Sequence, residues 1–485
     1  MNLETTSETK PHLGAVLALA CLAQFMVVLD VSVVNVALPA IRSSLHFSEQ
    51  DLQWVVNAYT VTFAGFLLLG GRAADLVGRR RVFISGLVLF ALASLAGGFA
   101  SSQSLLIAAR AAQGLGGAIV APASLSILTT TFEEGAARNR AVGIWGAMGG
   151  AGGAAGVLLG GVLTDLLSWR WILFINVPIG LIAALLAARY IAESRVRMSS
   201  RSFDLAGAVT ATVGLSLLVL GIVETDVTGW GSVSTIGLLA AGALLLILFV
   251  AIEGRFARSP LMPLRIYGSR TLSAANGVVL SVGAASFAMW FFLSLYLQQV
   301  LGYSPLRAGV AFVPMTLCIV AGSTIASRVV TRVGPKPILT AGMSLQAIGL
   351  ALFTQLSPHG TYLGDVLVPS LLIAIGIGFS FVPVTIAAVA GVASEEAGLA
   401  SGLVNTSRLV GGALGLAVLA ALATARTNGD LNHAVAAHAA LTSGFVLAFG
   451  IAAAFAAAGA VIALFGLPRV SLRGARRRAI AAESA

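Results

Sequence analysis

The sequence has little charge and almost no lysine. Only 10% of its 485 residues are charged, and Lys10 and Lys336 are its two lysines. Neither follows a glycine-rich loop of the kind that cradles nucleotide phosphates, which excludes hydrolysis of ATP by this chain.

Side chains that do chemistry are also scarce. The two cysteines, Cys21 and Cys318, lie within apolar runs, where a thiol usually serves as a small hydrophobe, so no disulfide framework is predicted. The five histidines are dispersed, no pair of them has the spacing of a metal site on one helix face, and no nucleophile elbow is found. We therefore expect no metal, no cofactor and no enzymatic activity.

Hydrocarbon is what the sequence has in excess. Hydrophobic residues make up 58% of the chain and the mean hydropathy is +0.96. Such a chain needs lipid as its solvent, and a helical span needs roughly 20 apolar residues, which predicts about fourteen spans. These are 13–39, 54–74, 83–100, 104–127, 141–163, 171–191, 205–223, 233–252, 271–297, 309–327, 338–356, 366–391, 398–424 and 443–466.

The basic residues predict how these spans are oriented. If both ends of the chain are cytoplasmic, the inner segments hold 23 of the 29 Lys and Arg residues. Cationic loops stay on the cytoplasmic side, so we expect a multi-pass protein of the cytoplasmic (inner) membrane with both termini inside. The net charge of +10 is spread over every inner loop, which favours contact with anionic lipid and excludes a nucleic-acid partner.

The chain is an internal duplication. A shift of 256 positions lays the segment 71–81 on 327–337 and Ser48 on Ser304, and the spans 205–223 and 233–252 have no counterpart in either copy. The predicted parts are a cytoplasmic tail (1–12), a six-helix half (13–192), a central linker with two extra helices (193–254), a second six-helix half (255–467) and a basic cytoplasmic tail (468–485). Duplicated bundles with a polar path between their halves are typical of secondary transporters.

Asp30 is the only carboxylate placed deep within a span. Burying its charge costs about 2.5 to 3.5 kcal/mol on insertion scales, so we expect it to be partnered, protonatable or both. Arg110 lies at a similar height in the fourth span and is the predicted partner, directly or through Gln113. The alternatives are structural: a hydrogen bond from Asp30 to a neighbour such as Asn35, and an Arg110 that only ties helices together.

A basic turn joins the second and third spans. The residues expected to act in it as a gate are Gly71, Arg72, Asp75, Gly78, Arg79 and Arg80. Gly71 would let the helix pack closely, Gly78 would adopt a left-handed turn, and Asp75 would accept from the amino terminus of an adjacent helix. The second copy has Thr331 and Pro335 in place of Asp75 and Arg79, so a charged latch is predicted only in the first half. The alternative is an ordinary basic inner loop.

Small residues recur along the fifth span. The expected helix-packing positions are Gly149, Gly153, Gly156, Gly160 and Gly161. Glycines at this spacing let two helices approach backbone to backbone, and such a surface could slide or seal when the halves rock.

Three of these segments resemble a known family from about Leu13 to Leu467. The loop 71–81 is similar to the signature loop of the major facilitator superfamily, whose fold is a bundle of transmembrane helices. Leu29–Pro39 resembles the first-span motif of its fourteen-span drug:proton antiporter family, and Arg110–Gly117 resembles that family's fourth-span motif. The fifth span is similar to its antiporter motif, with Val157 in place of the usual proline. This resemblance implies proton coupling through Asp30 and Arg110.

The sequence thus predicts a monomeric, proton-coupled antiporter that exports hydrophobic or amphiphilic drugs, dyes or antibiotics by alternating access. With one deep acid, neutral or monocationic compounds are the expected substrates. Besides Asp30, the residues expected to line the substrate cavity are Asn35, Gln113, Trp290, Asn405 and Arg408. The alternatives are a dedicated exporter of an endogenous metabolite, such as an antibiotic, siderophore or lipid, and a membrane sensor that does not transport.

Overall fold

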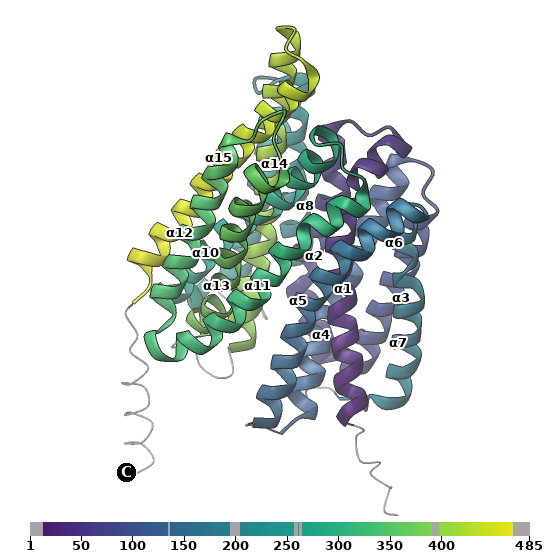
Figure 1. The fold of residues 1–485 in the computed structure, drawn as a ribbon. Helices are drawn as coiled ribbons and strands as arrows, with labels where there is room; N and C mark the ends of the chain where they lie inside the picture. The colour runs from purple at the N-terminus through teal and green to yellow at the C-terminus, as the bar shows by residue number, and fades with distance from the viewer. Residues whose placement is uncertain are drawn as a thin grey trace, which may run out of the picture.

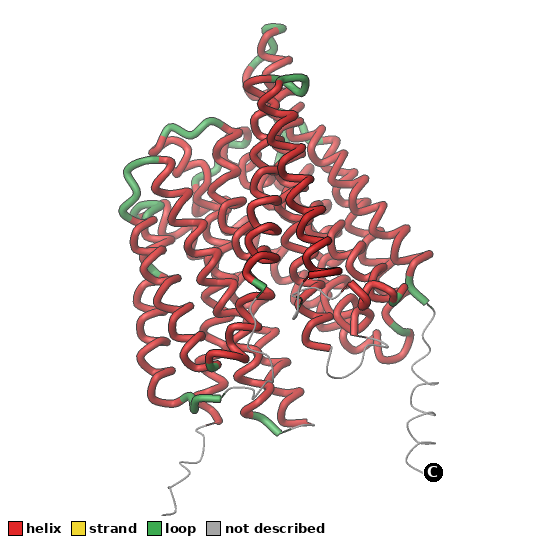
Figure 2. The backbone as a smooth tube through the Cα atoms, turned by 180° about the vertical axis from the view of Figure 1, so that it is seen from behind, coloured by secondary structure: helices red, strands yellow, loops and turns green. Residues whose placement is uncertain are grey.

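The chain folds into a bundle of long helices. The structure, a computed structural model, describes residues 13–133, 136–194, 204–256, 260, 264–389 and 397–468. No strand occurs among these residues, and short loops join the helices at both ends of the bundle (Figures 1 and 2). The predicted all-α membrane fold is confirmed, whereas residues 1–12 and 469–485 of the predicted tails lie outside the described residues.

The helices fall into two halves and a central pair. The first half contains α1 (Leu13–Leu45), α2 (Glu49–Val77), α3 (Arg79–Gly98), α4 (Gln103–Thr131), α5 (Ala136–Leu166), α6 (Trp171–Phe174) and α7 (Asn176–Tyr190). The central pair is α8 (Leu205–Thr228) and α9 (Val233–Ala251). The second half contains α10 (Arg270–Leu295), α11 (Pro305–Val333), α12 (Pro335–Leu352), α13 (Leu367–Val389), α14 (Ala397–Asn432) and α15 (Ala437–Gly466). Short 3₁₀ or π turns occupy Ile252–Phe256, Leu264–Gly268, Tyr296–Val300, Phe353–Gln355 and Tyr362–Val366.

Every predicted span falls on a helix. Among the described residues, eleven helical stretches are long and apolar enough to cross a membrane, with α6 and α7 forming one of them together. Parts of α5 and α8 are shorter apolar helices. The remaining span, α2, is more polar because it carries Gln53, Asn57 and Thr60. These side chains are buried inside the protein and do not face lipid.

Helix ends match at corresponding positions of the two predicted copies. Ser48 caps α2 by accepting from the backbone N–H of Asp51 at 2.9 Å, and Ser304 caps α11 by accepting from the N–H of Arg307 at 3.3 Å. The turns that follow these helices are centred on Gly78 and Gly334, with φ angles of +127° and +83°. A side chain at either position would be strained, so both copies depend on glycine for the same turn.

The two halves meet along two seams. One seam is formed by α5 and α11 and the other by α2 and α14, and α8 packs against both helices of the second seam. Between the halves, Ser294 donates to the carbonyl of Asn35 at 2.7 Å, and Gln298 donates to that of Val36 at 2.9 Å. These contacts lie toward one end of the bundle. The halves diverge toward the other end, where α1 begins and α15 finishes (Figure 1).

Candidate functional site

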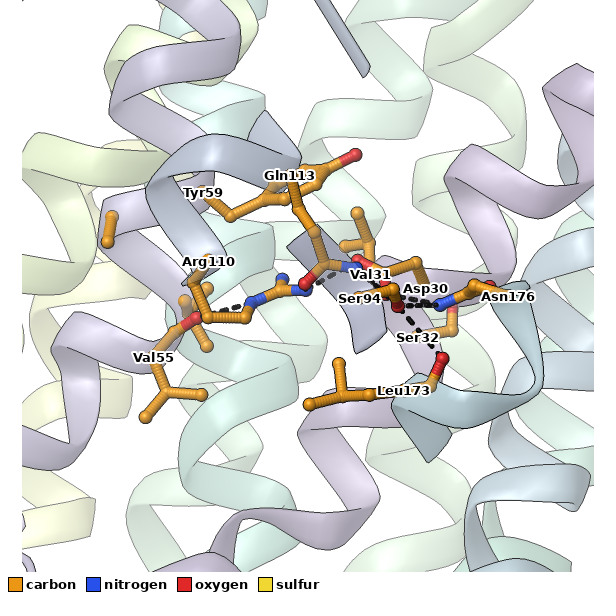
Figure 3. A network of polar contacts seen from close by, with 12 residues as sticks. Asp30, Val31, Ser32, Val55, Tyr59, Ser94, Arg110, Gln113, Leu173 and Asn176 are labelled. Carbon is orange, nitrogen blue, oxygen red and sulfur yellow. Dashed lines mark hydrogen bonds and ion pairs between the residues drawn. The ribbon is translucent and has the colours of Figure 1, made fainter. Parts of the chain in front are cut away.

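The centre of the first half holds a buried ion pair. Arg110 of α4 donates through Nη1 to Oδ2 of Asp30 on α1 at 2.5 Å, and the exposed fractions of the two side chains are 2% and 0% (Figure 3). The predicted contact between these residues is therefore present, and it is direct. A buried pair is retained only where other hydrogen bonds satisfy the remaining atoms of both charged groups.

Amide and hydroxyl groups complete the environment of the carboxylate. Gln113 donates to Asp30 Oδ1 at 3.1 Å and accepts from Arg110 at 3.0 Å, so it joins both members of the pair. Asn176 of α7 also donates to Asp30 Oδ1, at 2.8 Å. Ser94 of α3 accepts from both amides at 2.9 and 3.1 Å and donates to the carbonyl of Leu173 on α6. Side chains from three other helices, α3, α4 and α7, thus form the network around one carboxylate.

The second helix holds the arginine from its other side. The Nε atom of Arg110 donates to the carbonyl of Val55 on α2 at 2.9 Å, and its Cζ lies 4.5 Å from the centroid of the Tyr59 ring (Figure 3). A guanidinium can bond in its plane and stack on an aromatic face at once. Two polar atoms here, the Tyr59 hydroxyl and Asn176 Oδ1, are buried without a hydrogen-bond partner in the described part of the chain.

Chemically, the network joins one carboxylate to one permanent cation. The ionised pair is neutral as a whole, so it can exist in a site without water. Protonation of Asp30 would leave the charge of Arg110 uncompensated and weaken the link between α1 and α4. A single proton can therefore change how the helices of this half hold together.

The residues predicted to line a cavity are dispersed. Gln113 lies inside the buried network, and the side chain of Asn35 bonds to the carbonyl of Val31 on its own helix at 2.9 Å. In the second half, Trp290 of α10 packs on Phe312 with ring centroids 5.0 Å apart. Asn405 and Arg408 of α14 bond to each other at 2.8 Å, and both are partly exposed. The polar residues of the predicted cavity therefore lie in both halves, with Gln113 in the first and Asn405 and Arg408 in the second.

The predicted gate is a sharp turn between α2 and α3. Gly78 has the expected left-handed backbone. The close helix contact lies one residue before the predicted Gly71: a Cβ atom on Gly70 would be 2.2 Å from the carbonyl oxygen of Ala118, whereas one on Gly71 would meet only Pro122, at 3.4 Å. The side chains of Arg72 and Asp75 are outside the described residues, so the latch of Asp75 remains a prediction.

The described partners of this turn come from the segment after α7 and from α4. Glu193 accepts from the backbone N–H groups of Arg80 and Arg81 at 3.2 and 3.3 Å and forms ion pairs with both side chains. Arg79 donates to the hydroxyl of Ser126 on α4 at 2.6 Å. A carboxylate is favoured at a helix amino terminus, so Glu193 fixes the start of α3. The turn is tied to the far end of its own half.

Glycines bring α5 against two neighbours. A Cβ atom on Gly156 or Gly160 would lie 2.7 or 2.9 Å from a backbone oxygen of α1, and one on Gly161 would lie 2.8 Å from the carbonyl of Pro305 on α11. Gly149 and Gly153 leave more room, with no atom nearer than 3.5 Å. The predicted close packing thus occurs at three of the five positions. Val157, which replaces the proline of the resembled motif, directs its carbonyl at Gly309 of α11.

The sequence interpretation missed Asn176, Ser94 and Tyr59. Asn176 gave the clearest signal, because it is a polar residue within an apolar span and stands two positions before Pro178. Proline cannot donate a backbone hydrogen bond, so a helix is interrupted near it, and here the break separates α6 from α7. Ser94 and Tyr59 carry no comparable signal, since both residue types are common in membrane helices.

A bundle of membrane helices in two halves, with a buried ion pair inside one of them, is typical of secondary transporters. Sequence comparison places the chain in a family of that class. The pattern of the Major Facilitator Superfamily matches residues 20–416, and the chain belongs to this superfamily. It is a multi-pass membrane transporter and not an enzyme.

Several relatives are named as export or resistance proteins. The chain is 47% identical over 427 residues to the cephamycin export protein CmcT of Amycolatopsis lactamdurans, covering 88% of each chain. It is 41% identical over 446 residues to the puromycin resistance protein pur8 of Streptomyces alboniger, covering 91% of this chain and 88% of the relative. The multidrug resistance protein Stp of Mycobacterium tuberculosis (strain ATCC 25618 / H37Rv) is 35% identical over 404 residues, covering 83% and 74%.

Solved structures support the fold. A bacterial homolog of the human lysosomal transporter Spinster, in an inward-facing and unoccupied conformation, superimposes with a TM-score of 0.66 at 16% identity and covers 94% of this chain and 97% of its own. At this identity the likeness concerns the fold alone.

Proposed function

We propose that this transporter exports drug or antibiotic molecules across the cytoplasmic membrane in exchange for protons. The relatives at 35 to 47% identity, named for export or resistance, support the substrate class. The observation that carries the proton coupling is the buried carboxylate of Asp30, paired with Arg110 and enclosed by amide donors.

The coupling follows from competition for Arg110. When Asp30 is ionised, the guanidinium holds α1, α2 and α4 together through Asp30 and the carbonyl of Val55. When a proton binds Asp30, the arginine loses its counter-charge in a site where an uncompensated charge costs several kcal/mol. The two protonation states therefore favour different packings of this half, which is the requirement for linking proton movement to alternating access.

The arrangement of the halves fits one stage of such a cycle. Their hydrogen bonds lie toward one end, and they diverge at the end where α1 begins and α15 finishes. With both termini in the cytoplasm, as the basic residues predict, the divergent end faces inward. Both halves belong to one chain, so a monomer suffices for transport.

The test is uphill movement of fluorescent dyes out of proteoliposomes under an imposed pH gradient. Asp30→Asn keeps the shape of the side chain and one accepting oxygen but cannot titrate, so uphill transport should be lost while downhill movement persists. Asp430→Asn is the matched control, because Asp430 lies near the end of α14 and pairs with Arg426 at 3.3 Å. Undiminished uphill transport by a folded Asp30→Asn variant would remove Asp30 from the coupling role.

A further inference from the structure

Arg408 is fixed at the boundary of the two halves. Its own carbonyl packs against α10, where a Cβ atom on Gly283 would lie only 2.0 Å from that oxygen. The next residue, Leu409, is buried in the hydrophobic cluster of the first half, alongside Tyr59 and Phe63. Contacts with both halves therefore set the position from which the Arg408 side chain extends.

The guanidinium of Arg408 has no counter-charge in the described part of the chain. Its polar contact there is the amide oxygen of Asn405 at 2.8 Å, and the ring centroid of Phe381 lies 5.7 Å from its Cζ. Arg110, by contrast, is paired and 2% exposed, whereas Arg408 is partly exposed. An arginine within a membrane span costs about 2.5 to 3.5 kcal/mol, so it is normally paired or part of a ligand path.

Tyr59 lies between the buried network and the segment of α14 that follows Arg408. Its ring lies 4.5 Å from the Cζ of Arg110, and it shares a hydrophobic cluster with Leu409, the residue after Arg408. The hydroxyl is buried and lacks a hydrogen-bond partner among the described residues. It is therefore an unused donor next to the buried network.

Apolar surface adjoins these polar groups. Phe287 of α10 is partly buried and packs against the hydrophobic cluster of the first half and against the cluster that both halves share. Its ring also lies against α14, since a Cβ atom on Gly412, one helical turn after Arg408, would be 2.8 Å from it. A ligand at this boundary would meet a cation, an amide and aromatic rings.

The balance of charge selects among ligands. Asp30 and Arg110 neutralise each other, so Arg408 leaves this region with a net positive charge among the described residues. A cationic ligand would be repelled and a carboxylate would complete the missing pair, with the planar guanidinium able to bind it through two parallel bonds. From this we infer that the exported compound is an amphiphile with an acidic group, which Arg408 and Asn405 bind. The inference rests on the proposed export function and replaces the expectation of neutral or monocationic substrates.

Equilibrium binding tests the inference without requiring transport. The probes are a hydrophobic coumarin carboxylic acid and its carboxamide, which differ in charge and hardly in shape, titrated into purified protein in nanodiscs. The wild type should bind the acid at least about tenfold more tightly than the amide, as expected for a charge-assisted bidentate contact. In Arg408→Gln the two affinities should become nearly equal.

Two further variants keep the result interpretable. Arg426→Gln makes the same change on the same helix, at a side chain that is 56% exposed, and should keep the full preference for the acid. Arg408→Lys keeps the charge without the planar fork and should keep part of the preference, so it carries the test if Arg408→Gln does not fold. Equal affinities in the wild type, or a full preference in both Arg408 variants, would overturn the inference.

Transport of the same probes separates this inference from the proposed function. Proteoliposomes should move the acid uphill under a pH gradient and should move ethidium, a cation, at least about tenfold more slowly. A preference for the acid in binding, with no uphill movement of any probe, would refute the exporter and leave the acid site in place. Uphill movement of ethidium that equals or exceeds that of the acid would support the exporter and refute the acid site.

Discussion

At the scale of single residues, Arg110 does more than neutralise Asp30. Its Nη1 donates to Asp30 and Gln113, its Nε donates to the backbone carbonyl of Val55, and its plane stacks on the ring of Tyr59. These contacts need donors on two different nitrogens and a flat face that can stack on a ring, which a guanidinium provides. An ammonium group is a compact point charge and lacks that geometry.

Arg110→Lys is therefore expected to lose uphill transport by about tenfold or more, because the lysine cannot hold Asp30 and the carbonyl of Val55 together. The measurement is dye efflux from proteoliposomes under a pH gradient, with Arg426→Lys as the exposed control. If Arg110→Lys transports at the wild-type rate, charge alone suffices at this position and the network geometry has no role in coupling.

The sequence could predict this pair because buried charge is rare in it. Asp30 and Arg110 lie in apolar spans at similar heights, and opposite charges in lipid must meet. Asn176 and Ser94 were not predictable in the same way, since a neutral polar side chain can bond to its own helix, as Asn35 does. Which polar residues join the network depends on how each helix is rotated, and packing determines that rotation.

At the scale of elements, α5 holds α1 at the level of the ion pair. A Cβ atom on Gly156 would lie 2.7 Å from the carbonyl oxygen of Leu29, the residue before Asp30, and 2.7 Å from Cβ of Ser32. A Cβ atom on Gly153, one turn earlier, would have Ser32 Oγ at 3.8 Å as its nearest neighbour. The two glycines differ in the space around them and not in their helix.

Gly156→Ala should therefore destabilise the protein by about 1 to 3 kcal/mol, because the added methyl group must push two backbones apart. Gly153→Ala should be neutral or slightly stabilising, since it adds an ordinary contact and suits a helix better than glycine. The thermal unfolding midpoints of the two purified variants give the comparison. Equal midpoints would show that the helices separate without cost.

Helix ends were less predictable than helix existence. The span predicted at 398–424 extends as α14 to Asn432, where Arg426 and Asp430 form an ion pair one turn apart and Ser443 of α15 donates to Asp430. These polar contacts continue the helix beyond its apolar stretch. Hydropathy detects the part of a helix that lies in lipid, so it cannot report where polar groups prolong the helix in water.

At the scale of the whole molecule, the seam between α5 and α11 helps to close one end. A Cβ atom on Gly309 of α11 would lie 2.8 Å from the carbonyl oxygen of Val157 in the other half. Gly322, on the same helix, faces α13 of its own half, where a Cβ atom would be 3.3 Å from the carbonyl oxygen of Ile375. A methyl group at the first position would separate the halves, whereas one at the second would not.

Gly309→Ala is accordingly expected to weaken the closed end by about 1 to 3 kcal/mol and to raise the population of the opposite conformation about tenfold. Spin labels on Ser44→Cys and Thr354→Cys, exposed residues at this end of the two halves, report the change as a longer distance between them. Cys21 and Cys318 are replaced by alanine beforehand. Gly322→Ala should leave the distance distribution unchanged, and a Gly309→Ala distribution identical to it would contradict the role of this seam.

The two seams differ in what stands outside them. α8 lies against both α2 and α14, and a Cβ atom on Gly65 of α2 would be 1.9 Å from the hydroxyl oxygen of Thr212 on α8, so no room remains between these helices. In Figure 1 the seam of α5 and α11 lies on the near side of the bundle, with α8 behind. For an amphiphile dissolved in the surrounding lipid, α8 therefore screens one seam, whereas among the described helices none covers the other in the same way.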